Sequence, residues 1–273
     1  MSNTTSPRLS PAQVEKFRAE GYLIADEPVF TAEKFGRLKD SFETLLGGWP
    51  SDKRPEAINV PHFKNNHLLE WALAPEVLDL VEPLTGPDIL LFSTHFICKP
   101  QGDGRRVPWH EDSAYWKKHL DHPEEVVTIW LAIDPSTLAN GCMHVIPHTH
   151  NTGRKGFSDY DDVDLSKNVF STEITPSQRD EKLAVPIELQ PNHCSLHDAR
   201  IMHGSAPNTS DIRRCGWTLR FMPASVKLNE AICGVQLIYQ ARGRNLAGQT
   251  LADPKVSYGD PTEAFKAHGI KSH

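Results

Sequence analysis

Residues 107–116 read VPWHEDSAYW and place a histidine and an aspartate two positions apart, at His110 and Asp112. In a β-strand, residues i and i+2 point to the same side, so a strand here would direct both side chains into one cavity. Two histidines and one carboxylate form the ligand set of a facial Fe(II) site, which leaves other coordination positions open. The aromatic residues of the stretch can supply apolar walls. We therefore predict that His110 and Asp112 bind a metal inside a β-rich domain.

Spacing alone does not select this pair, because the chain contains 14 histidines. Similar spacings occur elsewhere, at His119/Asp121, His122/Glu124 and His148/His150. Residues 117–125 are mostly charged, which is typical of a solvated connector rather than of a dry metal cavity. The aromatic surroundings therefore favour the pair in residues 107–116.

A third ligand is predicted at His203, which ends an apolar stretch and precedes a turn. Further along, Arg214 begins the run RCGWTLRFM (214–222). In an alternating strand Arg214 shares a face with Gly216, Thr218 and Arg220, opposite Cys215, Trp217, Leu219 and Phe221. A buried arginine is costly unless it meets an anion, and a two-pronged pair with a carboxylate is a common solution. The residues alone leave open whether that carboxylate belongs to a ligand or to the protein.

Several further motifs follow in a recognisable order. The W-H-x-D stretch precedes VTIWLAID (127–134), NGCM (140–143), Ile146-Pro147, His203-Gly-Ser205, Asn208 and Arg214. Over residues 10–223 the chain resembles the phytanoyl-CoA dioxygenase family of Fe(II)- and 2-oxoglutarate-dependent oxygenases. It departs from the family at IPHTH (146–150), where a glycine-serine-histidine turn is common. We expect the two additional imidazoles, His148 and His150, to lie at the surface.

The resemblance implies a mainly β fold with flanking helices around a double-stranded β-helix (jelly-roll or cupin-like) core. It implies a dioxygenase that oxidises, and in the usual case hydroxylates, a C–H bond of a small molecule with release of succinate and CO₂. Asp112 argues against halogenation, because halogenases of this type leave that ligand position to chloride. The motifs do not distinguish hydroxylation from desaturation or cyclisation, and they do not identify the substrate.

The resemblance also assigns site residues by position. It implies that His110, Asp112 and His203 bind Fe(II), with 2-oxoglutarate and O₂ as co-substrates. Arg214 matches the arginine that grips the far carboxylate of 2-oxoglutarate. Three further positions match residues that line the co-substrate pocket, the last more weakly: Ser205, Trp130 and His95.

We predict one domain over residues 1–273, with a helical N-terminal part at 10–85 and a jelly-roll core at about 88–240. Ser10 and Thr31 are predicted helix caps, and Pro75 is expected to start a new helix within the helical region 67–84. Short β-branched or aromatic segments predict strands at 89–100, 126–134, 143–147, 183–189, 193–198 and 216–222. Residues 148–182 are long, polar and weakly patterned, which indicates a lid-like insertion or a solvated excursion. Residues 241–273 form a C-terminal extension.

The composition and charge of the chain indicate which classes of partner to expect. A formal net charge of -6 without a basic run argues against a nucleic-acid partner. No apolar stretch reaches the roughly 18 residues that span a bilayer, and residues 1–11 lack an apolar signal core. Five isolated cysteines fit a reducing cytoplasm. We expect a cytoplasmic monomer or homodimer with a small-molecule substrate, and Arg105 and Arg106 are either anion-binding residues or, as we favour, an exposed loop.

Two alternatives remain open. A cupin-like metalloenzyme of another class could use His148 and His150 with His193 or His197, and would turn over without 2-oxoglutarate. It would leave Arg214 unexplained. A non-catalytic small-molecule-binding relative would usually lack a metal ligand or the arginine, whereas all four residues are present here.

Overall fold

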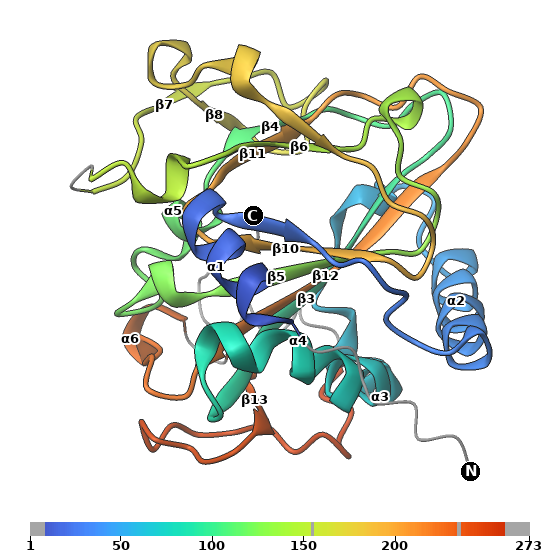
Figure 1. Cartoon of the computed structure of the whole chain (residues 1–273). Coiled ribbons are helices and arrows are strands. Elements are labelled where there is room, and N and C mark those ends of the chain that lie inside the picture. The colour runs from blue at the N-terminus through green and yellow to red at the C-terminus, as the bar shows by residue number, and fades with distance from the viewer. Residues whose placement is uncertain (1–8, 154–155, 234–235, 260–273) are drawn as a thin grey trace.

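The computed structural model describes residues 9–153, 156–233 and 236–259, and within these residues two antiparallel sheets face each other (Figure 1). The larger sheet has seven strands, in the order β1 (Tyr22–Ile24), β10 (Cys194–Asp198), β5 (Val127–Ala132), β12 (Arg214–Pro223), β3 (Ile89–Lys99) and β13 (Tyr239–Arg242), with β2 (Ile58–Asn59) paired to β3. The smaller sheet has the order β4 (Val107–His110), β11 (Met202–Ser205), β6 (Met143–Ile146) and β9 (Val185–Ile187). The prediction of a mainly β, jelly-roll core is confirmed, and each of the six predicted strand segments contains a strand.

Helices cover the outer face of the larger sheet. They are α1 (Pro11–Glu20), α2 (Ala32–Gly47), α3 (Leu69–Ala72) and α4 (Pro75–Thr85), with the short α5 (Asp112–Trp116) and α6 (Glu230–Cys233) elsewhere. Ser10 and Thr31 cap α1 and α2 through their side chains, and Pro75 starts α4, as predicted. Single-turn 3-10 helices lie at Pro55–Ala57, Pro61–Phe63, Asn66–Leu68, Pro123–Glu125, Leu138–Asn140, Thr149–Asn151, Pro176–Gln178 and Glu181–Leu183.

The alternation predicted for β12 is confirmed: one face of the strand lies in the hydrophobic core and the other faces the cavity. Cys215, Trp217, Leu219 and Phe221 are fully buried in the core that the larger sheet shares with α2 and α4. The opposite face of β12, from Arg214 to Arg220, lines a cavity between the two sheets. One strand therefore supplies both the hydrophobic core and the floor of the site.

Gly216 on β12 is required by the close approach of the Trp130 ring. A Cβ at this position would lie 1.9 Å from Cζ2 of Trp130, which is itself buried. We expect Gly216→Ala to lower the free energy of unfolding by roughly 1–3 kcal/mol, because overpacking forces neighbouring side chains off their preferred positions. Urea unfolding followed by circular dichroism measures this change.

The matched control for that substitution is Gly36→Ala in α2, where an added Cβ meets no atom within 4 Å. Alanine is favoured over glycine inside a helix by up to about 1 kcal/mol, so this variant is expected to be as stable as the wild type or more stable. Equal effects of the two substitutions would show that the Trp130 contact does not constrain Gly216.

The segment 148–182 is anchored to the smaller sheet rather than free in solvent. It contains a hairpin of β7 (Tyr160–Asp162) and β8 (Thr172–Ile174), seen above β4 in Figure 1. Glu173 of β8 accepts a hydrogen bond from the Trp109 amide at 3.1 Å and pairs with Arg106 and Arg179. Movement of the segment as a lid stays a prediction.

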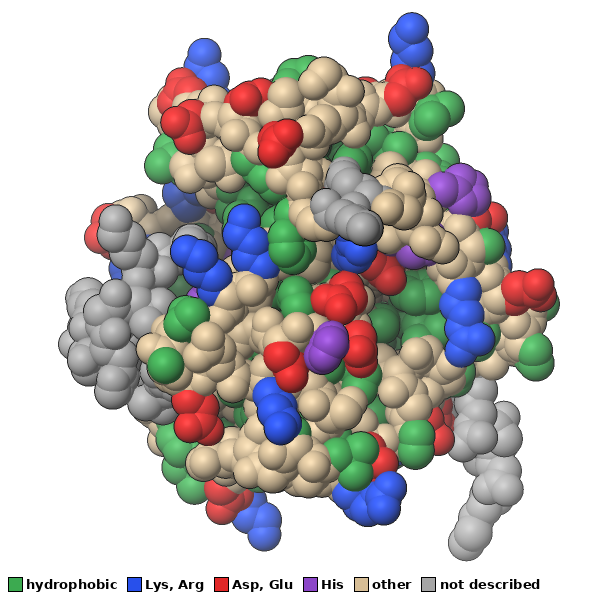
Figure 2. All heavy atoms as spheres, turned by 90° about the vertical axis from the view of Figure 1, so that its left-hand side faces the viewer, with side chains coloured by type: hydrophobic (Ala, Val, Ile, Leu, Met, Phe, Trp, Pro, Cys, Tyr) green, Lys and Arg blue, Asp and Glu red, His purple; other side chains and the backbone are tan. Residues whose placement is uncertain are grey.

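Other expectations concern the surface and the thiols. Cys98, Cys142, Cys194 and Cys215 are buried free thiols, and the side chain of Cys233 lies outside the described part. In the part of the chain described, no helix has the length and apolarity needed to cross a bilayer. On the face shown in Figure 2, acidic and basic side chains are interspersed rather than gathered by sign. The predicted extension 241–273 is described as far as residue 259.

Candidate metal centre

Two strands and the start of a helix bring the three predicted metal ligands together. His110 ends β4 and lies directly opposite His203 of β11 in the antiparallel register. The expected strand across the whole H-x-D motif is wrong, because β4 stops at His110 and Asp112 begins α5. Glu111 between them keeps an extended backbone, with φ -112° and ψ 129°, so Asp112 still faces the cavity. The ligand atoms of all three residues lie within 4.8 Å of one another.

Hydrogen bonds set the orientation of both imidazoles. Nδ1 of His110 donates to the Pro108 carbonyl at 2.8 Å, and Nδ1 of His203 donates to the Ile201 carbonyl at 3.0 Å. Each Nε2 is then free to bind a metal, since the proton of a neutral imidazole resides on the nitrogen that donates. Burial, followed by the neighbouring His110, holds the pKa of His203 well below its usual value, which keeps this ring neutral.

The carboxylate of Asp112 presents one oxygen to the histidines. Its Oδ1 lies 3.5 Å from Nε2 of His110 and 3.9 Å from Nε2 of His203. Its Oδ2 accepts hydrogen bonds at 3.4 Å from Oγ1 of Thr128 and from Nε of Arg220. Burial raises the pKa of Asp112, but the charge of Arg220 and the neighbouring imidazoles together outweigh burial, and the pKa stays well below its usual value. Two imidazole nitrogens and a carboxylate are the donors that a facial Fe(II) site needs.

The ligands open into a small cavity between the two sheets. Its walls come from both sheets and from the 148–182 segment, whose Phe170 ring packs edge-on against His110 with centroids 5.0 Å apart. The predicted co-substrate residues Ser205, Trp130 and Arg214 all lie in the lining. The other residues of the lining are Ile97, Val107, Met143, His197, Gly204, Thr218 and Arg220.

Arg214 is buried at one end of this cavity without an acidic partner. Its side chain is 1% exposed, its Nη2 donates to Oγ of Ser205 at 3.2 Å, and its guanidinium lies 5.3 Å from the Trp130 ring centroid. Within the described residues, its Nε has no hydrogen bond and no carboxylate reaches it within 4.0 Å. Burial lowers the pKa of Arg214 to about 10, so the group remains charged at neutral pH. The protein itself therefore does not supply the anion that this charge requires.

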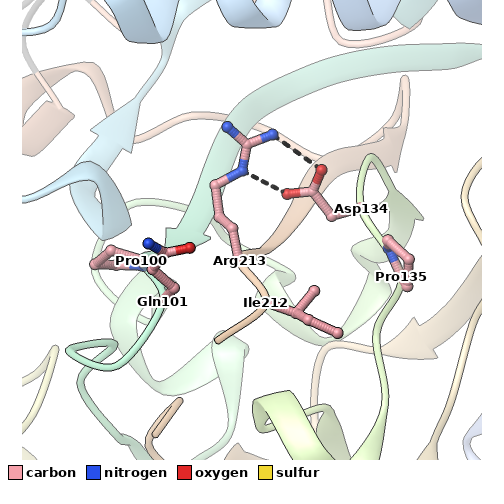
Figure 3. A pocket seen from close by; sticks show the side chains of 6 residues that line it. All are labelled: Pro100, Gln101, Asp134, Pro135, Ile212 and Arg213. Carbon is pink, nitrogen blue, oxygen red and sulfur yellow. Dashed lines mark hydrogen bonds and ion pairs between the residues drawn. The ribbon is translucent and has the colours of Figure 1, made fainter. Parts of the chain in front are cut away.

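The adjacent Arg213 shows the opposite arrangement. As Figure 3 shows, it makes a two-pronged pair with Asp134, at 2.7 Å and 2.9 Å, beside a surface pocket. It also pairs with Glu43 of α2. Arg213 thus links α2 to the chain after β5, whereas Arg214 points into the cavity.

Lys99, which the sequence reasoning missed, adds a second basic side chain beside Arg214. It is fully buried at the end of β3, directly opposite Arg214 in the β3–β12 register. Its Nζ donates to Oγ of Ser205 at 2.6 Å and to the Ala206 carbonyl. Burial, followed by the Arg214 charge, holds the pKa of Lys99 well below its usual value. A guanidinium and an amine that donate to one hydroxyl form a site for a carboxylate, whose negative charge would also favour the protonated form of Lys99.

Residues 9–216 match the family model described as Phytanoyl-CoA dioxygenase (PhyH). The chain belongs to the phytanoyl-CoA dioxygenase family. It is 30% identical over 224 residues to a probable alpha-ketoglutarate-dependent hypophosphite dioxygenase of Stutzerimonas stutzeri, covering 74% of each chain. It is 26% identical over 221 residues to the peroxisomal phytanoyl-CoA dioxygenase of Bos taurus, and this covers 80% of the chain but 64% of the bovine protein.

Solved structures share the fold. The non-heme monooxygenase ThoJ, in its apo form, superposes with a TM-score of 0.71 at 24% identity over 94% of each chain. EctD from S. alaskensis with 2-oxoglutarate and 5-hydroxyectoine superposes with a TM-score of 0.65 at 21% identity, over 84% of this chain and 80% of that one. Family membership and the His-Asp-His cluster together indicate a 2-oxoglutarate-dependent non-haem iron oxygenase, with iron and 2-oxoglutarate as its cofactors.

Three other histidines considered in the sequence, His95, His148 and His150, lie outside the His110–Asp112–His203 cluster. His148 and His150 donate to the Ala19 and Arg18 carbonyls, at 2.8 Å and 3.0 Å, and so fix the 146–150 turn to the end of α1. His95 donates to the Glu56 carbonyl at 2.9 Å and is not in the cavity lining, so its contact with co-substrate stays a prediction. Among the described residues, His110, Asp112 and His203 form the metal-capable cluster, and the alternative set based on His148 and His150 is not assembled.

The two arginines ahead of the iron motif contact acids of the protein. Arg106 pairs with Glu173 of the 148–182 segment, and Nε of Arg105 lies 3.9 Å from the Glu56 carboxylate. Both side chains are partly exposed, so the predicted loop position fits better than a site for a substrate anion.

Proposed function

We propose that this protein oxidises a C–H bond of a small-molecule substrate, by hydroxylation, while one 2-oxoglutarate and one O₂ are converted to succinate and CO₂. The observation that carries this proposal is that one cavity holds both the His-Asp-His cluster and Arg214, a buried guanidinium that has no acidic partner among the described residues. When bound, Fe(II) would activate O₂, which is the oxidant, and 2-oxoglutarate would supply two of the four electrons that O₂ takes up, the other two coming from the substrate.

The residues of the chain position these groups. His110 and His203 present Nε2 and Asp112 presents Oδ1, while Thr128 and Arg220 hold Oδ2. We assign the far carboxylate of 2-oxoglutarate to the clamp of Arg214, Lys99 and Ser205, since a guanidinium binds a carboxylate by two parallel hydrogen bonds. Because the side chains of this clamp are already held in place, the entropy cost of positioning the co-substrate is met on binding and not during the reaction.

Apolar side chains of the lining exclude water from the reacting atoms. Ile97, Val107, Met143 and Phe170 line the same cavity as the metal cluster. A dry cavity strengthens the electrostatic contacts within it and suppresses side reactions.

The relatives are named for substrates as different as hypophosphite and phytanoyl-CoA. We propose a small molecule that enters the cavity as a whole. A cytoplasmic location, a monomeric or homodimeric state, and the lack of nucleic-acid or membrane partners stay predictions.

Anaerobic titration of the Fe(II) protein with 2-oxoglutarate tests the proposal. We expect a metal-to-ligand charge-transfer band in the visible spectrum, saturating at one equivalent of 2-oxoglutarate. With O₂ and a screen of small acids and neutral metabolites, succinate release should rise when the substrate is present. Mass spectrometry of the product then distinguishes hydroxylation, which adds one oxygen atom, from desaturation, which removes two hydrogens. Metal-dependent turnover without 2-oxoglutarate would favour the cupin-like alternative.

A further inference from the structure

The cavity lining contains a second arginine, Arg220, which the proposed co-substrate clamp does not use. Arg214 and Arg220 lie on the same face of β12, six residues apart, which corresponds to roughly 20 Å along a strand. Arg214 contacts Ser205, whereas Arg220 contacts Asp112, on the other side of the metal cluster. The two arginines therefore serve different parts of the cavity.

The guanidinium of Arg220 is held in place but mostly unpaired. Its side chain is 12% exposed and lines the cavity, and it lies 5.4 Å from the Trp116 ring centroid. Only its Nε makes a hydrogen bond with a described residue, at 3.4 Å to Oδ2 of Asp112. An arginine has five N–H donors, so both terminal nitrogens remain available to a ligand.

His197, which lies beside Asp112 in the same cavity, also lacks a hydrogen-bond partner. Its side chain is 2% exposed and lines the cavity, with Nε2 3.8 Å from Oδ2 of Asp112. Among the described residues, neither ring nitrogen has a hydrogen-bond partner. Buried polar groups are rarely left unpaired, because each costs the free energy of its lost hydration. A partner is therefore expected in the working complex.

The charges of the loaded cavity indicate the sign of that partner. The two positive charges of the metal are offset by the two negative charges of 2-oxoglutarate. The single carboxylate of Asp112 then faces the guanidinium groups of Arg214 and Arg220, so positive charge is in excess. A buried charge is stabilised when an opposite charge or a hydrogen-bond partner accompanies it.

We propose that the substrate is a small acid whose carboxylate, sulfonate or phosphonate is bound by Arg220, with a hydrogen bond from His197. This arrangement places the substrate on the Asp112 side of the metal, away from the co-substrate clamp. The inference rests on the proposed function for the metal and 2-oxoglutarate, and it adds the chemical class of the substrate and two residues that select it.

Calorimetric titration of the Ni(II)-substituted, 2-oxoglutarate-loaded protein tests this inference without turnover. The probes are methanesulfonate and its neutral counterpart of similar shape, methanesulfonamide, with methylphosphonate as a second anion. We expect the anions to bind roughly 10–100-fold more tightly than the amide, as charged hydrogen bonds allow. Arg220→Gln should abolish this preference, and Arg220→Lys should restore part of it.

The matched control is Arg37→Gln, which removes an exposed arginine from α2 and should leave binding of both anions unchanged. Because Arg220 also donates to Asp112, Arg220→Gln is compared with the wild type at saturating Ni(II). Ni(II) binding weaker by more than the roughly 100-fold that loss of an outer-shell partner costs, or loss of 2-oxoglutarate binding, would overturn the inference, because Arg220 would then serve the metal site alone. Equal binding of sulfonate and amide, unchanged sulfonate binding in Arg220→Gln, or no binding of either anion at tens of millimolar would also overturn it. Failure of the wild type to bind 2-oxoglutarate, seen before any probe is added, would instead contradict the proposed function.

Discussion

Asp112→Ala is expected to abolish the charge-transfer band that the Fe(II) protein forms with 2-oxoglutarate. The substitution removes Oδ1, which faces Nε2 of both histidines, and leaves a two-histidine site. It also leaves Arg220 without its carboxylate partner, so the vacated space carries a positive charge that repels a cation. We expect the affinity for Fe(II) to fall by at least about 100-fold, beyond the 10–100-fold that loss of an outer-shell partner costs.

Anaerobic Fe(II) titration with a colorimetric competitor measures this loss. The matched control is Asp121→Ala, the same change in the other H-x-D spacing, at an exposed residue outside the cluster. Thr128→Val is the intermediate case, because it removes only the hydroxyl that donates to Oδ2 and should weaken iron binding by about 10-fold. A band that persists unchanged in Asp112→Ala would show that the metal is bound elsewhere.

The sequence predicted the metal ligands better than it predicted their local structure. His110 and Asp112 were expected on one strand, but the strand ends between them and a helix starts. The ligand assignment is unaffected by this difference, because the extended Glu111 preserves the side to which both side chains point. The two-residue spacing predicts the side to which both side chains point. That side is kept wherever the residue between them is extended, even if the backbone no longer makes the hydrogen bonds of a strand.

Arg214 and Lys99 show why one basic residue of the clamp was predictable and the other was not. The alternation of residues 214–222 is visible in the sequence and places Arg214 opposite a continuous apolar face. Lys99 ends an apolar strand just before Pro100, a position where a lysine usually reaches solvent. Its burial results from the pairing of β3 with β12, which places it opposite Arg214, and from the chain at 205–206 that covers it. Such a long-range register cannot be deduced from one sequence.

The same limit applies to the 148–182 segment. Its polar, weakly patterned sequence predicted either a lid or a solvated excursion. The structure shows that Glu173 ties it to β4 and that Phe170 forms a wall of the metal cavity. One aromatic residue within a polar stretch has no periodic neighbours, so pattern analysis does not identify it.

Arg214→Ala is expected to weaken 2-oxoglutarate binding by about 100-fold or more while Fe(II) affinity is largely kept. The guanidinium contributes two charged hydrogen bonds to a carboxylate, each of roughly 1.5–3 kcal/mol, but it contacts none of the three metal ligands. Arg213→Ala is the matched control, since it removes the neighbouring arginine and its pairs with Asp134 and Glu43. That variant should lose stability and bind 2-oxoglutarate normally.

The substitution Lys99→Met tests whether Lys99 binds 2-oxoglutarate or only stabilises the fold. It keeps the apolar stem and removes a buried amine that has no acidic partner, so the protein without 2-oxoglutarate should be as stable as the wild type or more stable. The increase in melting temperature that 2-oxoglutarate produces should shrink in Lys99→Met and nearly vanish in Arg214→Ala, because a ligand stabilises a fold in proportion to the logarithm of its affinity. Thermal unfolding with and without 2-oxoglutarate measures both quantities. If Lys99→Met instead destabilised the ligand-free protein and left the 2-oxoglutarate shift intact, the lysine would be a structural residue, and Arg214 with Ser205 would form the clamp alone.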